Sequence, residues 1–230
     1  MTDKKTNIAI WLHSAKNFRR IVGLNGMLLP ILLWAFLYLS SGNAEVLESI
    51  SHYYYTPANS IFIGIMATLS MFLIVYNYKD RKLDFVLSCI AGIAAICVIL
   101  FPTNNLVDSA AAIDGSYIIS YTEPSSLRVG FHYVSAALFF LVLAYMSAFL
   151  FTKSNPAKPR SPHKRLRNRI YRVCAVLMVL SILAILLLGK FNLISSLPYD
   201  EWKLTFWLEV LAVESFGISW LVKGEFFFAD

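Results

Sequence analysis

Six stretches of the sequence are apolar with little interruption for about 20 residues, the length that a helix needs to cross roughly 30 Å of hydrocarbon. Strands of a membrane barrel would alternate between polar and apolar positions, so these continuous runs predict helices. The predicted spans are Ile21–Ser40, Ser60–Tyr78, Leu83–Phe101, Val129–Thr152, Ile170–Leu188 and Leu204–Val222. We therefore predict an all-α integral membrane protein, a bundle of six transmembrane helices.

The two ends of the chain are predicted to be short cytoplasmic segments outside the bundle. Apolar residues at helical spacing beside basic ones predict a short interfacial helix within a cytoplasmic segment at 1–20. The transmembrane domain then occupies 21–222, and 223–230 is a cytoplasmic tail. The longest connection, about 27 residues, is too short to form an independent soluble domain.

The first apolar run has a second interpretation, since it follows a basic start and precedes Gly42-Asn43-Ala44, a passable signal-peptide cleavage site. A signal core is about 7 to 15 residues long, whereas this run is about 20. Its length favours a retained transmembrane helix.

The composition agrees with a membrane protein. Hydrophobic residues make up 58% of the chain and charged residues 15%, against about 25% charged in ordinary soluble domains, and the mean hydropathy is +0.62. The net charge of +6 could indicate a nucleic-acid partner, but the distribution of the charges excludes one.

Most basic residues fall on one side of the predicted bundle. Of the 20 Lys and Arg residues, 17 lie at the N-terminus, after the second and fourth spans, or in the tail, and Arg128, Lys190 and Lys203 lie on the other side. Short cytoplasmic loops retain Lys and Arg. We therefore predict N-in, C-in topology in the cytoplasmic (inner) membrane, with both termini cytoplasmic.

The basic connection 153–172 carries eight of these residues and three prolines, at 156, 159 and 162. The prolines predict an extended start, which leaves a PxxP recognition motif open as an alternative. The simpler prediction is a solvated tether whose charges contact anionic lipid headgroups.

Two acidic residues lie inside the last predicted span. Glu209 is about five residues from its outer end and Glu214 is near the middle, where an acidic side chain costs about 2.5 to 3.5 kcal/mol. His132 and Arg128, at the outer end of the fourth span, are the candidate partners of Glu209. Because the two acids point about 140° apart around the helix, we assign Glu209 to an outward-facing pocket and Glu214 to a separate position between helices.

The loop before the second span contains Ser49-Ile50-Ser51-His52-Tyr53-Tyr54-Tyr55. Three consecutive tyrosines at a membrane boundary are most simply an aromatic belt. In the alternative, Ser51, His52 and a tyrosine fold inward over His132 and Glu209, and Pro102-Thr103-Asn104-Asn105 closes a third side of the pocket.

These landmarks resemble a known family. Ser-Ile-Ser-His-Tyr-Tyr-Tyr-Thr-Pro before the second span, Phe-His-Tyr-Val-Ser at His132, and Phe-Trp-Leu-Glu at Glu209 are similar to the Frag/DRAM/Sfk group of six-span proteins and related bacterial membrane proteins. The resemblance implies a role in lipid handling and supports Ser51, His132 and Glu209 as family-like positions. His52 departs from the pattern, because an acidic residue is expected there.

The function predicted from these observations is binding or regulation of membrane lipid through the outward-facing pocket. The predicted binding residues are Ser51, His52, Asn104, Arg128, His132, Glu209 and Glu214.

Three alternatives remain open. One is a lipid-modifying hydrolase or transferase, with Glu209 as general base and His132 as its partner, or with two His and a carboxylate at a metal. Another is a serine nucleophile, which no Gly-x-Ser-x-Gly motif supports. The third is a proton-coupled carrier using Glu209 and Glu214. The sequence contains no HxxxH, HExxH or CxxC motif, so we predict no metal site, and no cofactor is identified.

Overall fold

The computed structural model describes residues 2–76, 82–154, 161–190 and 196–228, and every regular element within these ranges is helical. The long helices are α1 (Thr2–Ser41), α2 (Asn59–Ile74), α3 (Lys82–Leu100), α4 (Ser126–Tyr145), α5 (Pro162–Ala184) and α7 (Leu204–Lys223). The short elements are η1 (Ile50–Tyr55), η2 (Ala110–Ala112) and α6 (Ser196–Glu201), and π-helical turns η3 (Met146–Leu150) and η4 (Ile185–Lys190) extend α4 and α5.

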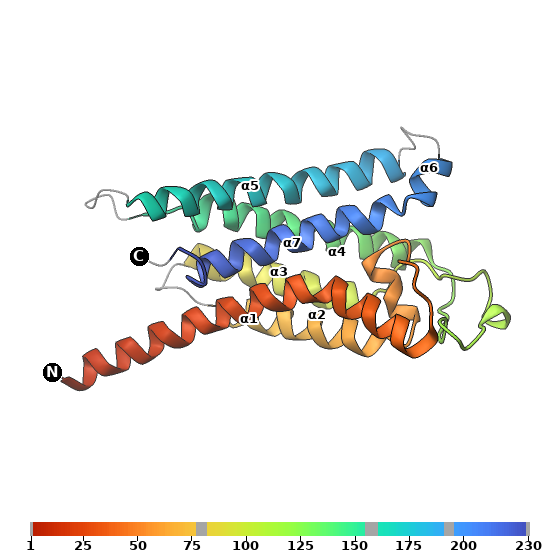
Figure 1. The fold of residues 1–230 in the computed structure, drawn as a ribbon, viewed down its shortest axis with the longest axis horizontal. Helices are drawn as coiled ribbons and strands as arrows, with labels where there is room; N and C mark the ends of the chain where they lie inside the picture. The colour runs from red at the N-terminus through yellow and green to blue at the C-terminus, as the bar shows by residue number, and fades with distance from the viewer. Residues whose placement is uncertain (1, 77–81, 155–160, 191–195, 229–230) are drawn as a thin grey trace.

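The six long helices form a closed ring. Each of α1 to α5 packs against the next in chain order, and α7 packs against both α5 and α1. Both termini lie at one end of the bundle, and η1, the 101–125 loop and α6 lie at the other (Figure 1). We call this second end the η1 end. The basic residues that the structure describes in the predicted cytoplasmic segments therefore share the end that carries the termini.

The lengths of the helices indicate an integral membrane protein. Within the described ranges, five helical segments are long and apolar enough to cross a membrane: Ala15–Ser41, Lys82–Leu100, Ser126–Leu150, Pro162–Gly189 and Leu204–Lys223. Large apolar side chains such as Leu39, Val134 and Val176 face outward, as a lipid-facing surface requires.

The second predicted span is shorter than the others. Its helix α2 is apolar but has 16 residues, which gives a length of about 24 Å at 1.5 Å per residue, less than the hydrocarbon thickness. The prediction of six complete crossings thus stays a prediction, although six apolar helices are present in the described chain.

Two boundaries differ from the predicted ones. The expected interfacial helix is not a separate element, since α1 continues without a break from Thr2 to Ser41. Helix α5 begins at Pro162, well before the predicted Ile170, because Ser161 caps it by accepting a hydrogen bond from the Lys164 N–H at 3.1 Å. The second half of the basic connection is therefore helical, while 155–160 lies outside the described residues.

The C-terminal segment is held against the bundle. Arg20 of α1 donates hydrogen bonds to the carbonyls of Gly224 and Glu225, at 2.9 and 3.0 Å, and Lys16 forms an ion pair with the Glu225 carboxylate. Arg167 of α5 donates to the Phe228 carbonyl at 2.9 Å. These contacts join the middle of α1 and the start of α5 to the segment that follows α7.

Small residues allow α1 and α7 to approach closely. A Cβ atom added at Gly217 would lie 2.8 Å from the Gly23 carbonyl oxygen, and one added at Gly23 would lie 2.7 Å from the Gly217 carbonyl oxygen. Close approach at small residues is the usual way for helices to associate in lipid. This contact closes the ring between the first and the last of the long helices.

Candidate functional site

Element η1 folds into the bundle at the η1 end. Ser49 caps it: its hydroxyl accepts from the His52 N–H at 3.3 Å and lies 2.8 Å from the His52 Nδ1. The side chains of Tyr53 and Tyr55 are fully buried, and the Tyr55 hydroxyl donates to the Thr103 carbonyl at 2.7 Å. The predicted aromatic belt is therefore wrong for these two tyrosines, and the inward-folded alternative describes this segment.

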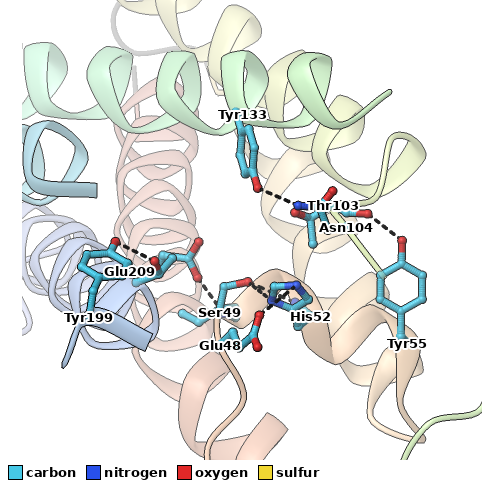
Figure 2. Close-up of polar contacts among 11 residues, drawn as sticks. Glu48, Ser49, His52, Tyr55, Thr103, Asn104, Tyr133, Tyr199 and Glu209 are labelled. Carbon is cyan, nitrogen blue, oxygen red and sulfur yellow. Dashed lines mark hydrogen bonds and ion pairs between the residues drawn. The ribbon is translucent and has the colours of Figure 1, made fainter. Parts of the chain in front are cut away.

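Burial also determines the state of His52. It lowers the pKa of His52 to about 4, and electrostatic repulsion from His132 and Lys203 adds to the effect. The Glu48 carboxylate lies 3.9 Å from the ring and would favour the charged form, but it is largely solvated and therefore screened. His52 is thus neutral at physiological pH and bonded to Ser49 (Figure 2).

Glu209 connects α7 to the start of η1. Its Oε2 accepts a hydrogen bond from the Ile50 N–H at 2.6 Å. Figure 2 shows the carboxylate pointing toward η1, with Tyr199 on its other side. Tyr199 is itself bonded to Thr205 at 2.7 Å. A backbone donor thus partners the carboxylate that the sequence analysis expected near His132 or Arg128.

His132 of α4 holds Ser51. Its Nδ1 lies 2.8 Å from the Phe101 carbonyl, and its Nε2 lies 3.0 Å from the Ser51 Oγ. Because a carbonyl can only accept, Nδ1 carries a proton. When the ring holds a single proton, Nε2 is therefore an acceptor and the Ser51 hydroxyl donates to it. The residue that follows α3, helix α4 and element η1 thus meet at this buried imidazole.

A cavity of about 50 Å³ lies inside the ring of helices, next to Ser51 and Glu209. Helices α1, α2, α3, α4 and α7 and the start of η1 all contribute to its wall. Most of the lining is aliphatic or aromatic, including Met66, Phe139 and Val213, and the hydrophilic side chains in it are Ser51 and Glu209. The cavity is thus apolar with one polar end, at η1.

A second hollow, of about 440 Å³, opens at the N-terminus of α4. It is lined by the 104–105 and 124–126 segments and by Arg128, Gly130 and Tyr133, among others. Arg128 donates to the Glu123 carbonyl at 2.8 Å, and the Asn104 amide is 3.5 Å from the Tyr133 hydroxyl (Figure 2). We call this hollow the mouth.

The predicted site residues therefore fall into three groups. Ser51 and Glu209 line the central cavity, and His132 bonds to Ser51 from outside its lining. Asn104 and Arg128 line the mouth.

His52 and Glu214 belong to neither hollow. His52 is turned toward Ser49, and Glu214 is half-buried farther along α7. From the sequence we expected one pocket for all of these residues except Glu214. The structure instead divides them between two hollows that share α4 as a wall, and leaves His52 outside both.

Several functional contacts use atoms that sequence reasoning did not consider. The Ile50 N–H and the Phe101 carbonyl are backbone groups, so residue type gives no signal for them. Ser49 could have been found, because Ser is a preferred residue immediately before the first residue of a helix.

No group of three or more His, Cys, Asp or Glu side chains is placed to hold a metal ion in the ranges that the structure covers. Comparison of the chain with family models, with curated proteins and with solved structures gives no match. The resemblance to the Frag/DRAM/Sfk group therefore stays a prediction.

Proposed function

We propose that the protein binds a membrane lipid or similar amphiphile at the η1 end of the bundle. The observation that carries the proposal is the central cavity, whose walls are apolar and whose polar end contains Ser51 and Glu209. A ligand with an apolar chain and a polar group is the chemical complement of such a lining. Lipid also surrounds these helices in a membrane, so the proposed ligand is always present next to the protein.

The two hollows suit different parts of an amphiphile. The mouth, about 440 Å³ in volume, has Arg128 and the amides of Asn104 and Asn105 in its lining, which suits a polar or anionic headgroup. The cavity of about 50 Å³ has the volume of one or two water molecules. A longer chain enters it by displacing flexible lining side chains, of which Met66 has the most rotatable bonds.

The basic residues at the opposite end support a second, weaker lipid contact. Arg165, Arg169 and Arg172 are exposed and are spaced to lie on one face of α5, whereas the guanidinium of Arg167 is turned inward to Phe228. We infer that these three exposed arginines contact anionic headgroups of the cytoplasmic leaflet, with both termini on that side.

Lipid retained through purification tests the binding proposal. Ala136 lines the cavity and the adjacent Ala137 does not, so Ala136→Leu and Ala137→Leu form a matched pair. Mass spectrometry of extracts should show a defined lipid on the wild type and on Ala137→Leu, and several-fold less on Ala136→Leu. The proposal fails if all three proteins carry only the bulk lipid composition of the membrane.

A further inference from the structure

We propose that Ser51 is a nucleophile, with His132 as its general base, and that together they cleave the acyl ester bond of a membrane lipid. This inference rests on the proposed function for the delivery of the lipid. It goes beyond binding, because it assigns a reaction to the polar end of the central cavity.

The hydrogen bonds around His132 have the arrangement that activates a hydroxyl. An activated serine needs a base within hydrogen-bond reach and a third group that orients the base. The Ser51 Oγ is 3.0 Å from the Nε2 of His132, and the opposite nitrogen, Nδ1, is 2.8 Å from the Phe101 carbonyl. The carbonyl fixes the proton on Nδ1 and directs Nε2 toward Ser51, which is the orienting part of the role that a carboxylate has in a Ser-His-Asp triad.

The position of Ser51 also gives it access to a substrate. Its side chain is buried, yet it lines the central cavity beside Glu209. Ser51 is part of the cavity lining, whereas His132, which bonds to its hydroxyl, is not. The hydrogen bond from Ile50 to Glu209 holds the preceding residue in place.

Neighbouring serines lack this combination. The Ser49 hydroxyl is bonded to His52 and lines neither hollow. Ser135 is buried one helical turn from His132 and is absent from both linings. Among the serines that the structure describes, Ser51 is therefore the one that joins a histidine acceptor to a cavity.

The wall of the cavity indicates the class of substrate. Phe62, Met66, Phe139 and Phe140 form an apolar surface next to Ser51, which suits a hydrocarbon chain attached to the reacting carbonyl. In glycerolipids the hydrocarbon chain is attached through an ester, whose carbonyl carbon a serine can attack.

The reaction balances in two steps. The Ser51 Oγ bonds to the ester carbonyl carbon as its proton moves to His132 Nε2, and His132 then gives that proton to the departing alkoxide as the ester C–O bond breaks. The products are an acyl-Ser51 ester and a free alcohol. A water molecule next gives its proton to His132 and attacks the acyl carbon, which releases the fatty acid and returns the proton to Ser51.

An alkyl fluorophosphonate, which forms a covalent bond with activated serines, tests this inference on the full-length protein in detergent. We expect one adduct on the wild type, mapped by peptide mass spectrometry to Ser51, and none on Ser51→Ala. Removal of the base in His132→Gln should slow labelling by about a hundredfold or more. Ser116→Ala, an exposed serine in the 101–125 loop, should label at the wild-type rate.

Mapping on the wild type keeps the test valid even where a variant does not fold. An unlabelled Ser51 in wild-type protein that carries a defined lipid overturns the nucleophile and leaves the binding proposal intact. A labelled Ser51 in protein that carries only bulk lipid supports the nucleophile and contradicts a resident ligand. Equal labelling rates for His132→Gln and the wild type overturn the role of His132.

Discussion

The Glu209 carboxylate accepts a hydrogen bond from the backbone N–H of Ile50 at 2.6 Å, across 159 positions of sequence. This contact ties the last transmembrane helix to the first residue of η1. The next residue in η1, Ser51, thereby faces the central cavity and reaches His132 at 3.0 Å. The position of the candidate nucleophile thus depends on an acidic side chain from a different helix.

Removal of the Glu209 carboxyl group should destabilise the protein. In Glu209→Ala the buried Ile50 N–H loses its acceptor, which costs about 1 to 3 kcal/mol of unfolding free energy. Glu209→Gln retains a side-chain oxygen and should lose much less. Unfolding in SDS titrations measures both variants, and an equal loss for Ala and Gln would show that the charge, rather than the hydrogen bond, is what stabilises η1.

Stability should fall in acid because of His52. Its pKa is about 4 in the folded protein and about 6.5 when unfolded, so between these values the unfolded chain binds more protons. The stabilisation from neutral His52 is complete above pH 6.5 and is lost as the pH falls through about 4, by about 3 kcal/mol in all. His52→Gln should show a correspondingly flatter pH dependence of unfolding.

A His52→Gln profile as steep as the wild-type profile between pH 6.5 and 4 would mean that His52 is not the titrating group.

The contact of α1 with α7 should tolerate no added side chain at Gly217. An alanine Cβ there would collide with Met27 and lie 2.8 Å from the Gly23 carbonyl, so we expect Gly217→Ala to cost about 1 to 3 kcal/mol. Gly64→Ala is the matched change, because no atom lies within 4 Å of an added Cβ there. Similar unfolding midpoints for both variants would show that this helix pair can separate easily.

Cysteine labelling should establish which side of the membrane each end faces. In a background without Cys89, Cys97 and Cys174, an impermeant maleimide added to intact cells should label Ser116→Cys in the 101–125 loop. Arg165→Cys, which is also exposed, should label only after the membrane is permeabilised. The reverse pattern would invert the predicted topology.

The sequence was sufficient to predict the helical bundle but not all of its boundaries. Long apolar runs identify helices because lipid requires them, and six apolar helices are found in the described chain. The start of α5 was placed too late, since Arg165, Arg167 and Arg169 are polar on a helix that begins outside the apolar region. The hydrophobic pattern of the sequence does not distinguish a polar helical extension of this kind from a loop.

The sequence predicted which residues form the candidate site, but it did not predict which of them contact one another. Glu209 and His132 were selected because polar residues are costly inside a span, and Ser51 was selected from the polar loop before the second span and from the family resemblance. The structure brings all three to one end of the bundle. His132 bonds to Ser51, and His52 does not bond to His132. This choice of partner depends on the turn of η1 and on backbone groups of Ile50 and Phe101. Side-chain identity carries no information about those groups.

Photocrosslinking with a lipid that carries a diazirine in its acyl chain tests the binding site most directly. After irradiation of vesicles that contain the protein, peptide mass spectrometry identifies the labelled residues. Binding in the central cavity predicts adducts on its lining residues Met66, Phe139 and Val213, and fewer on these residues in Ala136→Leu. Adducts confined to outward-facing residues of α4, such as Val134, Leu138 and Leu141, would contradict the account.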